Sequence, residues 1–372
     1  MSHLAVADQK GAAAMAPAFS IRQEIVSLSQ ITKSFGPTLA NAEIDLAVSA
    51  GEIIGLVGGN GAGKSTLMRI LCGTMWPTLG SISFAGQMLS FADYNTMEAQ
   101  RRGIRMVHQE LSLCANLSVA ENFFLETPQD AASRPGWRRL YRGRARSALD
   151  AVFPGNTIDV NADVGQLSIA ERQMVEIARA AATPGVRLIV LDEPTSSLDL
   201  DRSKQLRAFI RERAKAGLAF IFISHKLQEI IDIAAQIVVL RNGRTAWRGD
   251  VADTSISRLV QLMGGDANSV HQHGATAASA GGALVRLSGA LTAELGRDIE
   301  IARGEIVGLA GLEGSGQKDL LHAIFKPGKD AAVTRTGEAG FIAGDRQKEG
   351  VFPLWSVLGN ISIGSLARRP AL

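Results

Sequence analysis

The chain has 372 residues, 46% hydrophobic and 20% charged, which is the composition of a soluble globular protein long enough for two domains. Its net charge of +3 is too small to indicate a nucleic-acid-binding protein by itself, and no apolar run approaches the roughly 18 residues of a membrane-spanning helix. The two cysteines, Cys72 and Cys114, are too few for a disulfide framework, so a reducing cytosol is the simpler inference.

A tail and two strands come first. Residues 1–22 are rich in alanine and lack the basic stretch and apolar core of a signal peptide, which predicts a disordered tail. Glu24–Phe35 and Ala42–Val48 are predicted strands. Phe35 ends the first of them and is a candidate for stacking on adenine, with a place in the core as the alternative.

A phosphate-binding loop follows. Within residues 58–66, the first eight match the pattern G-x-x-x-x-G-K-[ST]. They lie between a short apolar strand, Ile53–Val57, and a helix with one apolar face, which is the context that the pattern requires. The glycines let the backbone approach phosphates, and the helix presents unpaired N–H groups to an anion. Lys64 is expected to reach the β- and γ-phosphates and Ser65 to hold Mg²⁺. The predicted nucleotide-binding residues are Gly58, Gly59, Asn60, Gly61, Ala62, Gly63, Lys64, Ser65 and Thr66.

Two stretches separate this loop from the next motif. The predicted strand Gly103–Val107 leads to Gln109, a candidate contact to Mg²⁺ or to the attacking water. Residues 118–151 are predicted to be helical, and apolar residues recur there at helical spacing: Trp137, Leu140, Tyr141, Ala148 and Val152. The arginines between them therefore indicate a solvated face or a protein-docking surface, with a nucleic-acid patch as the alternative. They are Arg134, Arg138, Arg139, Arg142, Arg144 and Arg146.

Carboxylates and a histidine end two further predicted strands. The apolar strand Val186–Leu191 runs into Asp192 and Glu193, and adjacent carboxylates at the tip of a buried strand cost free energy unless a cation or a reaction needs them. Asp192 is the predicted Mg²⁺ partner, and Glu193 the base that polarises the attacking water. The strand Ala219–Ile223 leads to His225, a candidate contact to the γ-phosphate or else a structural histidine.

The order and spacing of these motifs resemble an ABC-transporter ATPase domain over Gln23–Gly264. The motifs are the phosphate loop, Gln109, the helix opened by Leu167-Ser168, Asp192-Glu193, Ser197-Leu198-Asp199 and His225. The resemblance implies an α/β P-loop NTPase fold with an antiparallel β subdomain and a helical subdomain. It also implies that two such domains meet head to tail, so that ATP lies between one phosphate loop and the Leu-Ser signature of the other domain.

The resemblance assigns roles to individual positions. Phe35 would stack on adenine, and Gln109 would sense Mg²⁺ and couple the site to a membrane partner. Glu193 would be the general base, and His225 would hold the γ-phosphate. Ser168 would contact ATP in trans.

An internal repeat extends the pattern. Gly51–Gly58 recurs 253 residues later as Gly304–Gly311, and Ser356-Val357 with Asn360 echoes an earlier Ser-Val…Asn string. Residues 23–264 are therefore the predicted first ATPase domain, 265–282 a linker, and 283–372 the N-terminal part of a second copy. That copy is expected to be defective, because Gln317 and Lys318 replace the lysine and serine of the loop and no second Leu-Ser signature follows.

The first copy's signature departs from the general Leu-Ser-Gly-Gly-Gln form. Ile169 and Ala170 add bulk where glycines let a backbone approach a phosphate, and Glu171 adds a negative charge. Ser168 and Glu171 also fit the S-x-x-E capping box, which would occupy Ser168 with its own helix. The hypothesis is that this signature supports weak or no hydrolysis.

The tandem copies and two strings, residues 167–178 and 344–350, resemble the ATPase subunit of bacterial monosaccharide importers of the ribose, galactose and xylose type. The resemblance implies ATP and Mg²⁺ as cofactors, integral-membrane permease subunits and a periplasmic sugar-binding protein as partners, and a peripheral place on the cytoplasmic face of the inner membrane. Gly59, where a glutamate is usual, and the incomplete second copy depart from that family. Pairing of two first domains as a homodimer stays open. The alternatives are a soluble tandem ABC ATPase that acts on ribosomes or nucleic acid, and a nucleotide-binding chain without turnover.

Overall fold

The computed structural model describes residues 23–108, 112–127, 135–264, 282–289, 298–311, 316–326, 332–343 and 350–366. The chain divides into two compact units, Met1–Ala267 and Asn268–Leu372. Over the described residues, no helix has the length and hydropathy of a membrane span.

The first unit opens with an antiparallel sheet. Its strands are β1 (Glu24–Phe35), β2 (Thr38–Ser49), β4 (Leu79–Phe84) and β5 (Gln87–Leu89), in the order β2-β1-β4-β5. Every second residue of β2 from Ala42 to Val48 is apolar and buried, because alternate side chains of a strand share one face. The sheet is the antiparallel β subdomain expected from the sequence.

A six-stranded, mostly parallel sheet forms the centre of this unit. Its order is β10-β9-β3-β8-β7-β6, and only β10 runs antiparallel to its neighbour. The strands are β3 (Ile53–Gly58), β6 (Ile104–Val107), β7 (Leu188–Asp192), β8 (Ala219–Ile223), β9 (Gln236–Arg241) and β10 (Arg244–Asp250). Parallel strands bring their carboxyl ends to one edge, and there the segments that follow β3, β6, β7 and β8 meet.

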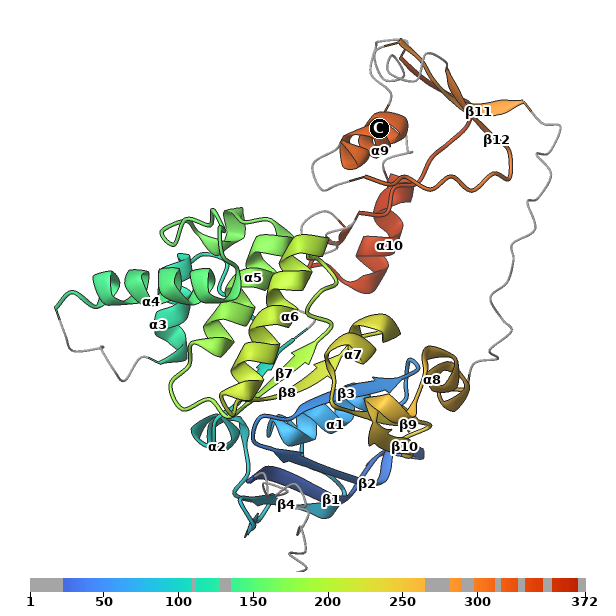
Figure 1. Cartoon of the computed structure of the whole chain (residues 1–372). Helices are drawn as coiled ribbons and strands as arrows, with labels where there is room; N and C mark the ends of the chain where they lie inside the picture. Colours follow the sequence, from blue (N-terminus) through green and yellow to red (C-terminus); the bar gives the residue numbers. More distant parts are fainter. Residues whose placement is uncertain are drawn as a thin grey trace, which may run out of the picture. The chain divides into compact units, whose positions relative to one another are not determined.

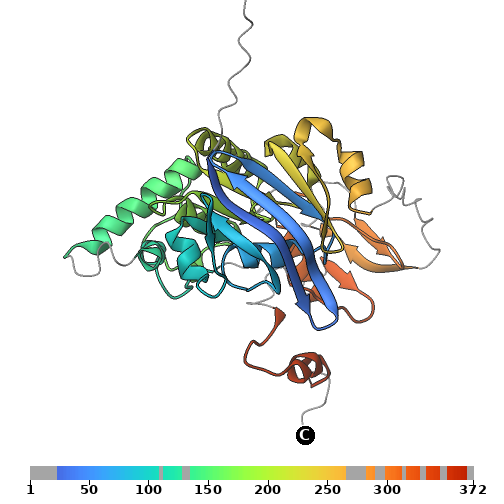
Figure 2. The same ribbon diagram turned by 90° about the horizontal axis from the view of Figure 1, so that it is seen from below.

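Apolar layers cover both faces of the central sheet. Ile54 and Leu56 of β3 face one core cluster with the antiparallel sheet, whereas Ile53 and Val57 face another with the helices α4 and α5. Figure 1 shows α3, α4 and α5 together beside the sheet, and Figure 2 shows β1 and β2 (blue) across its other face. The helices are α1 (Lys64–Leu71), α2 (Thr96–Arg101), α3 (Val119–Glu126), α4 (Trp137–Val152), α5 (Ile169–Ala181), α6 (Leu200–Lys215), α7 (Leu227–Ile233) and α8 (Ile256–Leu262).

The helical region predicted over 118–151 consists of two helices, α3 and α4, rather than one. The buried stripe of α4 is Tyr141, Ala145, Leu149 and Val152, at the spacing of one helix face. The prediction that Leu140 belongs to this face is wrong, since its side chain is 43% exposed. Leu140 precedes Tyr141 and is therefore turned about 100° away from the stripe. Arg134 lies outside the described residues.

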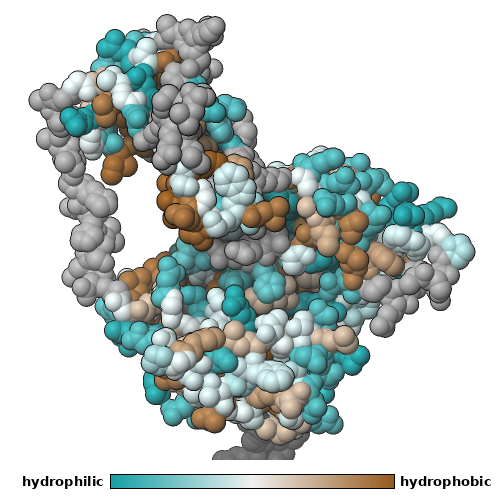
Figure 3. All heavy atoms as spheres, turned by 180° about the vertical axis from the view of Figure 1, so that it is seen from behind, coloured by the Kyte–Doolittle hydropathy of each residue, from teal (hydrophilic) through white to brown (hydrophobic). Residues whose placement is uncertain are grey.

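The second unit contains β11 (Ala283–Leu287), β12 (Ile299–Ala302) and β13 (Val333–Arg335), paired antiparallel in the order β12-β11-β13, with helices α9 (Gln317–Phe325) and α10 (Val357–Leu366). Residues 305–311, which contain the near-identical counterpart of β3, form no strand, and Ile306 is 98% exposed. The repeated sequence alone does not make a strand, because β3 is held between β8 and β9 and no described strand of the second unit lies beside 305–311. Apolar patches of this unit reach the surface (Figure 3).

Candidate active site

The phosphate loop closes between β3 and α1. Gly63 precedes the helix with a φ of +98°, and a Cβ there would lie 2.3 Å from the Ala40 carbonyl oxygen, so only glycine fits. At Gly59 a Cβ would meet no atom within 4 Å. A side chain would therefore fit at position 59. Steric crowding in the loop does not explain why this chain has glycine where the family resemblance leads us to expect glutamate.

Asn41 supports this loop from β2, and sequence reasoning missed it. Its side chain is fully buried, and Nδ2 donates a hydrogen bond of 3.1 Å to the Gly63 carbonyl. Asn41 is paired with Lys33 of β1, whose Nζ lies 5.2 Å from the centre of the Phe35 ring. Phe35 is 47% exposed, so the core alternative for this residue is wrong. Its role in stacking on adenine stays a prediction.

Lys64 bends back over the loop. Its Nζ donates hydrogen bonds of 2.7 Å to the Gly58 carbonyl and 3.0 Å to the Gly59 carbonyl. Burial lowers the pKa of Lys64, and the carboxylates of Asp192 and Glu193 partly oppose that shift. The ammonium thus lies near both predicted acidic residues, where phosphate oxygens would find a partly desolvated cation.

Asp192 is the last residue of β7. Burial raises the pKa of its carboxyl, the neighbouring Glu193 raises it further, and Lys64, His108 and Arg69 oppose the rise. A carboxylate that burial disfavours gains from a metal cation. The position therefore suits a ligand of Mg²⁺.

Glu193 and His225 lie side by side at the ends of β7 and β8. Glu193 Oε1 is 3.1 Å from His225 Nδ1. Glu193 has a φ of +50°, a conformation that costs a non-glycine residue about 1–3 kcal/mol, and its N–H donates to the Ile223 carbonyl at 2.9 Å. The hydrogen bond to β8 holds the strained residue and aims its carboxylate at the histidine.

A buried acid on α7, also missed by sequence reasoning, joins the two loops behind this pair. Glu229 Oε2 accepts hydrogen bonds from Thr195 Oγ1 at 2.6 Å and from Ser224 Oγ at 3.2 Å. Thr195 follows the acidic pair, and Ser224 precedes His225. Glu229 therefore fixes the distance between the predicted base and the predicted γ-phosphate contact.

The predicted signature lies at the start of α5 and has the capping box expected from its sequence. Glu171 N–H donates to Ser168 Oγ at 3.2 Å, and Ser168 N–H donates to Glu171 Oε2 at 2.9 Å. The hydrogen bonds of Ser168 thus stay within its own helix. Gln109, the remaining predicted site residue, lies outside the described residues.

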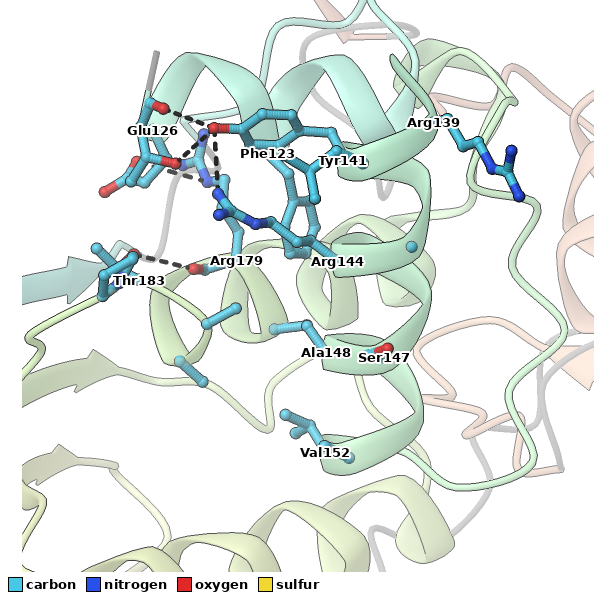
Figure 4. A pocket seen from close by; sticks show the side chains of 18 of the residues that line it. Phe123, Glu126, Arg139, Tyr141, Arg144, Ser147, Ala148, Val152, Arg179 and Thr183 are labelled. Atoms are coloured by element: carbon cyan, nitrogen blue, oxygen red, sulfur yellow. Dashed lines mark hydrogen bonds and ion pairs between the residues drawn. The ribbon is translucent and has the colours of Figure 1, made fainter. Parts of the chain in front are cut away.

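A pocket of about 1120 Å³ lies among α3, α4, α5 and α6. Figure 4 shows Glu126, Tyr141, Arg144 and Arg179 gathered at one end, while Arg139 points away. Arg144 donates to the Tyr141 hydroxyl at 3.3 Å and packs over the same ring. Other arginines of the predicted cluster also bind within the fold: Arg138 pairs with Glu121, and Arg146 with Asp150. The side chains of Arg138 and Arg146 are 64% and 39% exposed, which fits the predicted solvated face.

Comparisons with known proteins identify the family of the chain. Residues 42–196 match the family model described as ABC transporter. The chain is 36% identical, over 92% of its length and 71% of the relative, to "Ribose import ATP-binding protein RbsA 2" of Burkholderia cenocepacia (strain HI2424). It is also 36% identical to "Putative ribose/galactose/methyl galactoside import ATP-binding protein 3" of Agrobacterium fabrum, over 91% of the chain and 70% of that relative. The chain belongs to the ABC-transporter import ATP-binding family.

Solved structures support the same fold. A dimeric ATP-binding cassette in a post-hydrolysis state, bound to ADP and Pi, aligns with a TM-score of 0.55 and 24% identity over 61% of this chain and 99% of its own. An ATP-binding cassette in its ADP conformation aligns with a TM-score of 0.53 and 23% identity over 65% of this chain and 99% of its own. The P-loop ATPase fold and ATPase activity expected from the sequence are therefore confirmed at the level of the family.

The raised pKa of Asp192 predicts a cost in stability. A carboxyl whose pKa is raised by folding destabilises the fold when it ionises, so the penalty grows as the pH rises above its ordinary value of 3.8 and is full above the folded-state pKa. Asp192→Asn is therefore expected to raise the Tm of the nucleotide-free chain at pH 7 by an amount on the order of a few degrees, with no gain near pH 3. Asp201→Asn is the control, because that side chain is 87% exposed. An equal change in the two variants contradicts the prediction, and thermal melts at both pH values measure it.

Proposed function

We propose that the protein is the ATP-hydrolysing, energy-coupling subunit of a bacterial importer for a monosaccharide. The observation that carries the proposal is the meeting of the phosphate loop, the Asp192-Glu193 pair and His225 at one edge of the central sheet. The relatives named for ribose and galactose import support a monosaccharide as the cargo.

The site residues divide the chemistry among them. The backbone of residues 58–66 and the Lys64 ammonium bind the β- and γ-phosphates, and Phe35 stacks on adenine. Glu193 takes the proton of the attacking water, and His225 holds both Glu193 and the γ-phosphate in place. Gln109, which lies outside the described residues, is proposed to sense the metal and the attacking water.

Mg²⁺ fits the residues present. Over the described residues, no group of three or more His, Cys, Asp or Glu side chains forms a cage for a metal ion. Mg²⁺ that accompanies a nucleotide needs no such cage, since it is held by one or two protein ligands, phosphate oxygens and water. Ser65 and the desolvated carboxylate of Asp192 would be those ligands, and a bound ion would supply positive charge to the phosphates.

We infer that two chains pair head to tail, with Ser168 of each facing the nucleotide of the other. The capping box opposes this contact. The Glu171 carboxylate accepts from the Ser168 N–H, so a negative charge lies at the start of α5, where a phosphate would approach. Glu171→Gln keeps an acceptor for the cap and removes the charge. It is expected to lower the KM for ATP or to raise turnover by about two- to five-fold, as measured by steady-state phosphate release.

Glu121→Gln is the matched control for that variant. The N-terminus of α3 carries the same capping box, made by Ser118 and Glu121, away from the predicted signature. If Glu171→Gln and Glu121→Gln leave ATP kinetics equally unchanged, the charge of Glu171 does not restrain the signature.

The partners follow from the importer proposal. Permease subunits in the inner membrane receive the energy of hydrolysis, a periplasmic sugar-binding protein delivers the sugar, and this chain lies on the cytoplasmic face. The test is affinity purification of the tagged chain from membranes of its own cell. We expect integral-membrane permease subunits to co-purify. Ribosomes or RNA in their place would support the soluble-ATPase alternative and overturn the importer proposal.

We propose further that 23–264 is the first ATPase domain, 265–282 a linker, and 283–372 part of a second copy. Local geometry supports this. The Ala302 N–H donates to Glu305 Oε2 at 2.7 Å, 253 residues after the bond of 2.9 Å from Ser49 N–H to Glu52 Oε2. The helix α9 begins after Gly316 at a φ of +84°, as α1 begins after a left-handed glycine. Gln317 cannot supply the ammonium of Lys64, so this copy does not hold a triphosphate.

A further inference from the structure

Glu176, in the middle of α5, has a carboxylate that the proposed function does not use. Its side chain is 1% exposed, and burial raises the pKa of the carboxyl. A buried carboxylate costs free energy unless it is hydrogen-bonded or paired. The apolar side chains around it on the helix, such as Met174 and Ile177, need no such partner. The acid must therefore serve a contact outside α5.

That contact is Ser112. Its N–H donates to Glu176 Oε2 at 2.9 Å, and its hydroxyl donates to Glu176 Oε1 at 2.8 Å. Both carboxylate oxygens are thus used by one residue, 64 positions away in the sequence. Bonds to an ionised acceptor are stronger than bonds between neutral groups, and two of them fix position and direction together.

A chain of alternating charges extends the contact through the helical subdomain. Arg179 Nη2 donates to Ser112 Oγ at 3.0 Å and lies 4.0 Å from Glu176 Oε1. Arg179 Nε lies 3.9 Å from Glu126 Oε2 of α3, and Glu126 Oε1 lies 2.7 Å from Arg105 Nε of β6. All four charged side chains are at most 17% exposed. Figure 4 shows Glu126 and Arg179 close together in the pocket wall.

The contact between Glu176 and Ser112, called the clamp below, joins two parts of the ATPase site. Ser112 lies five residues after the end of β6, whose carboxyl end reaches the catalytic edge of the sheet. Past Ser112, the chain is fixed again by Asn122, whose Oδ1 accepts from the Cys114 N–H at 2.8 Å. The other side of the clamp is the helix that begins after Ser168. His108, directly after β6, lies near enough to both Glu176 and Asp192 to oppose the rise in the pKa of their carboxyls.

We propose that Glu176 is a positioning residue of the ATPase: its carboxylate fastens Ser112 to α5, so that Ser112 and the signature at Ser168 move as one piece when two chains close on ATP. The inference rests on the proposed function. Because Ser112 is bonded to α5, a movement of the signature helix during closure moves Ser112 as well. Glu176 couples these movements without contacting the nucleotide.

The test compares turnover and ATP binding in three variants of the whole chain. Glu176→Met keeps the volume and removes the acceptor, Ser112→Ala removes the hydroxyl, and Glu176→Gln keeps one acceptor. We expect Glu176→Met to lower kcat about tenfold or more while the Kd for ATP stays within about twofold, and Glu176→Gln to recover most of the loss. The double variant Glu176→Met with Ser112→Ala should lose no more kcat than Glu176→Met alone, because both substitutions break the same contact.

Gln173→Met is the matched control, because Gln173 is a polar residue of the same helix at 3% exposure, and its Nε2 has no hydrogen-bond partner among the described residues. We expect it to leave kcat within about twofold. Equal loss in Gln173→Met and Glu176→Met, or normal kcat in Glu176→Met, overturns the positioning role.

Hydrogen exchange separates this inference from the proposed function. The Ser112 amide should exchange at least about tenfold faster in Glu176→Met than in the wild type or in Gln173→Met, because its acceptor is gone. If the wild type shows no turnover, the proposed function fails and exchange at Ser112 still decides whether the clamp exists. Unchanged exchange in Glu176→Met overturns the clamp in either case.

Discussion

Glu193→Gln is expected to lower ATP turnover at least about 100-fold while ATP binding is retained, because a positioned general base contributes about 10²–10⁴ to a rate and makes no essential contact to the bound phosphates. The glutamine keeps the size of the side chain and the backbone bond to Ile223, so the strained conformation of residue 193 is preserved. The measurements are steady-state phosphate release and equilibrium binding of ATP. ATP-dependent pairing should increase in this variant, since the paired state is no longer resolved by hydrolysis.

Glu212→Gln is the control for Glu193→Gln, because Glu212 lies on α6 away from the carboxyl edge of the sheet. Its turnover should equal that of the wild type. Turnover in Glu193→Gln within about threefold of the wild type would mean that another group polarises the water.

Lys64→Ala is expected to weaken ATP binding by about tenfold or more and to abolish turnover. The ammonium is already partly desolvated, so binding a phosphate costs little further desolvation. Its charge-assisted hydrogen bonds to the phosphate therefore contribute strongly to affinity. Lys318→Ala offers a control within the same chain, because Lys318 occupies the serine position of the repeated loop and α9 carries Asp319 in its first turn. Isothermal titration with ATP should give wild-type affinity for Lys318→Ala. Equal loss in both variants contradicts the assignment of a single competent loop.

Local patterns allowed much of this fold to be predicted. The strands β1 and β8 have the predicted bounds, and the phosphate loop lies between strand and helix as its motif requires. These features depend on residues adjacent in sequence: alternating burial, an apolar run, a glycine at a left-handed turn. For the same reason the capping box at Ser168 could be recognised from four letters.

The supports of the site were beyond sequence reasoning, because their partners lie far away along the chain. Asn41 bonds to a residue 22 positions away, Thr195 to one 34 away, and Ser112 to one 64 away. A buried asparagine or glutamate in a sequence gives no sign of which backbone it holds. One signal was available for Glu176: an acid within a helix segment whose other buried residues are uncharged and mostly apolar.

The internal repeat shows that a local sequence pattern does not by itself determine a strand. Residues 305–311 carry nearly the sequence of β3 and form no strand. A central parallel strand is stabilised by its neighbours on both sides more than by its own β propensity, and the neighbours of β3 come from 219–241 of the chain.

The measurement that tests the central claim most directly is ATP hydrolysis by the purified chain as a function of chain concentration, with and without Mg²⁺. The account predicts turnover that requires Mg²⁺ and whose rate per chain rises with concentration, because the loop at Lys64 needs the Ser168 signature of a second chain. ATP binding without phosphate release at any concentration, in the presence of membranes that contain the permease, would contradict the claim that this protein is the motor of an importer.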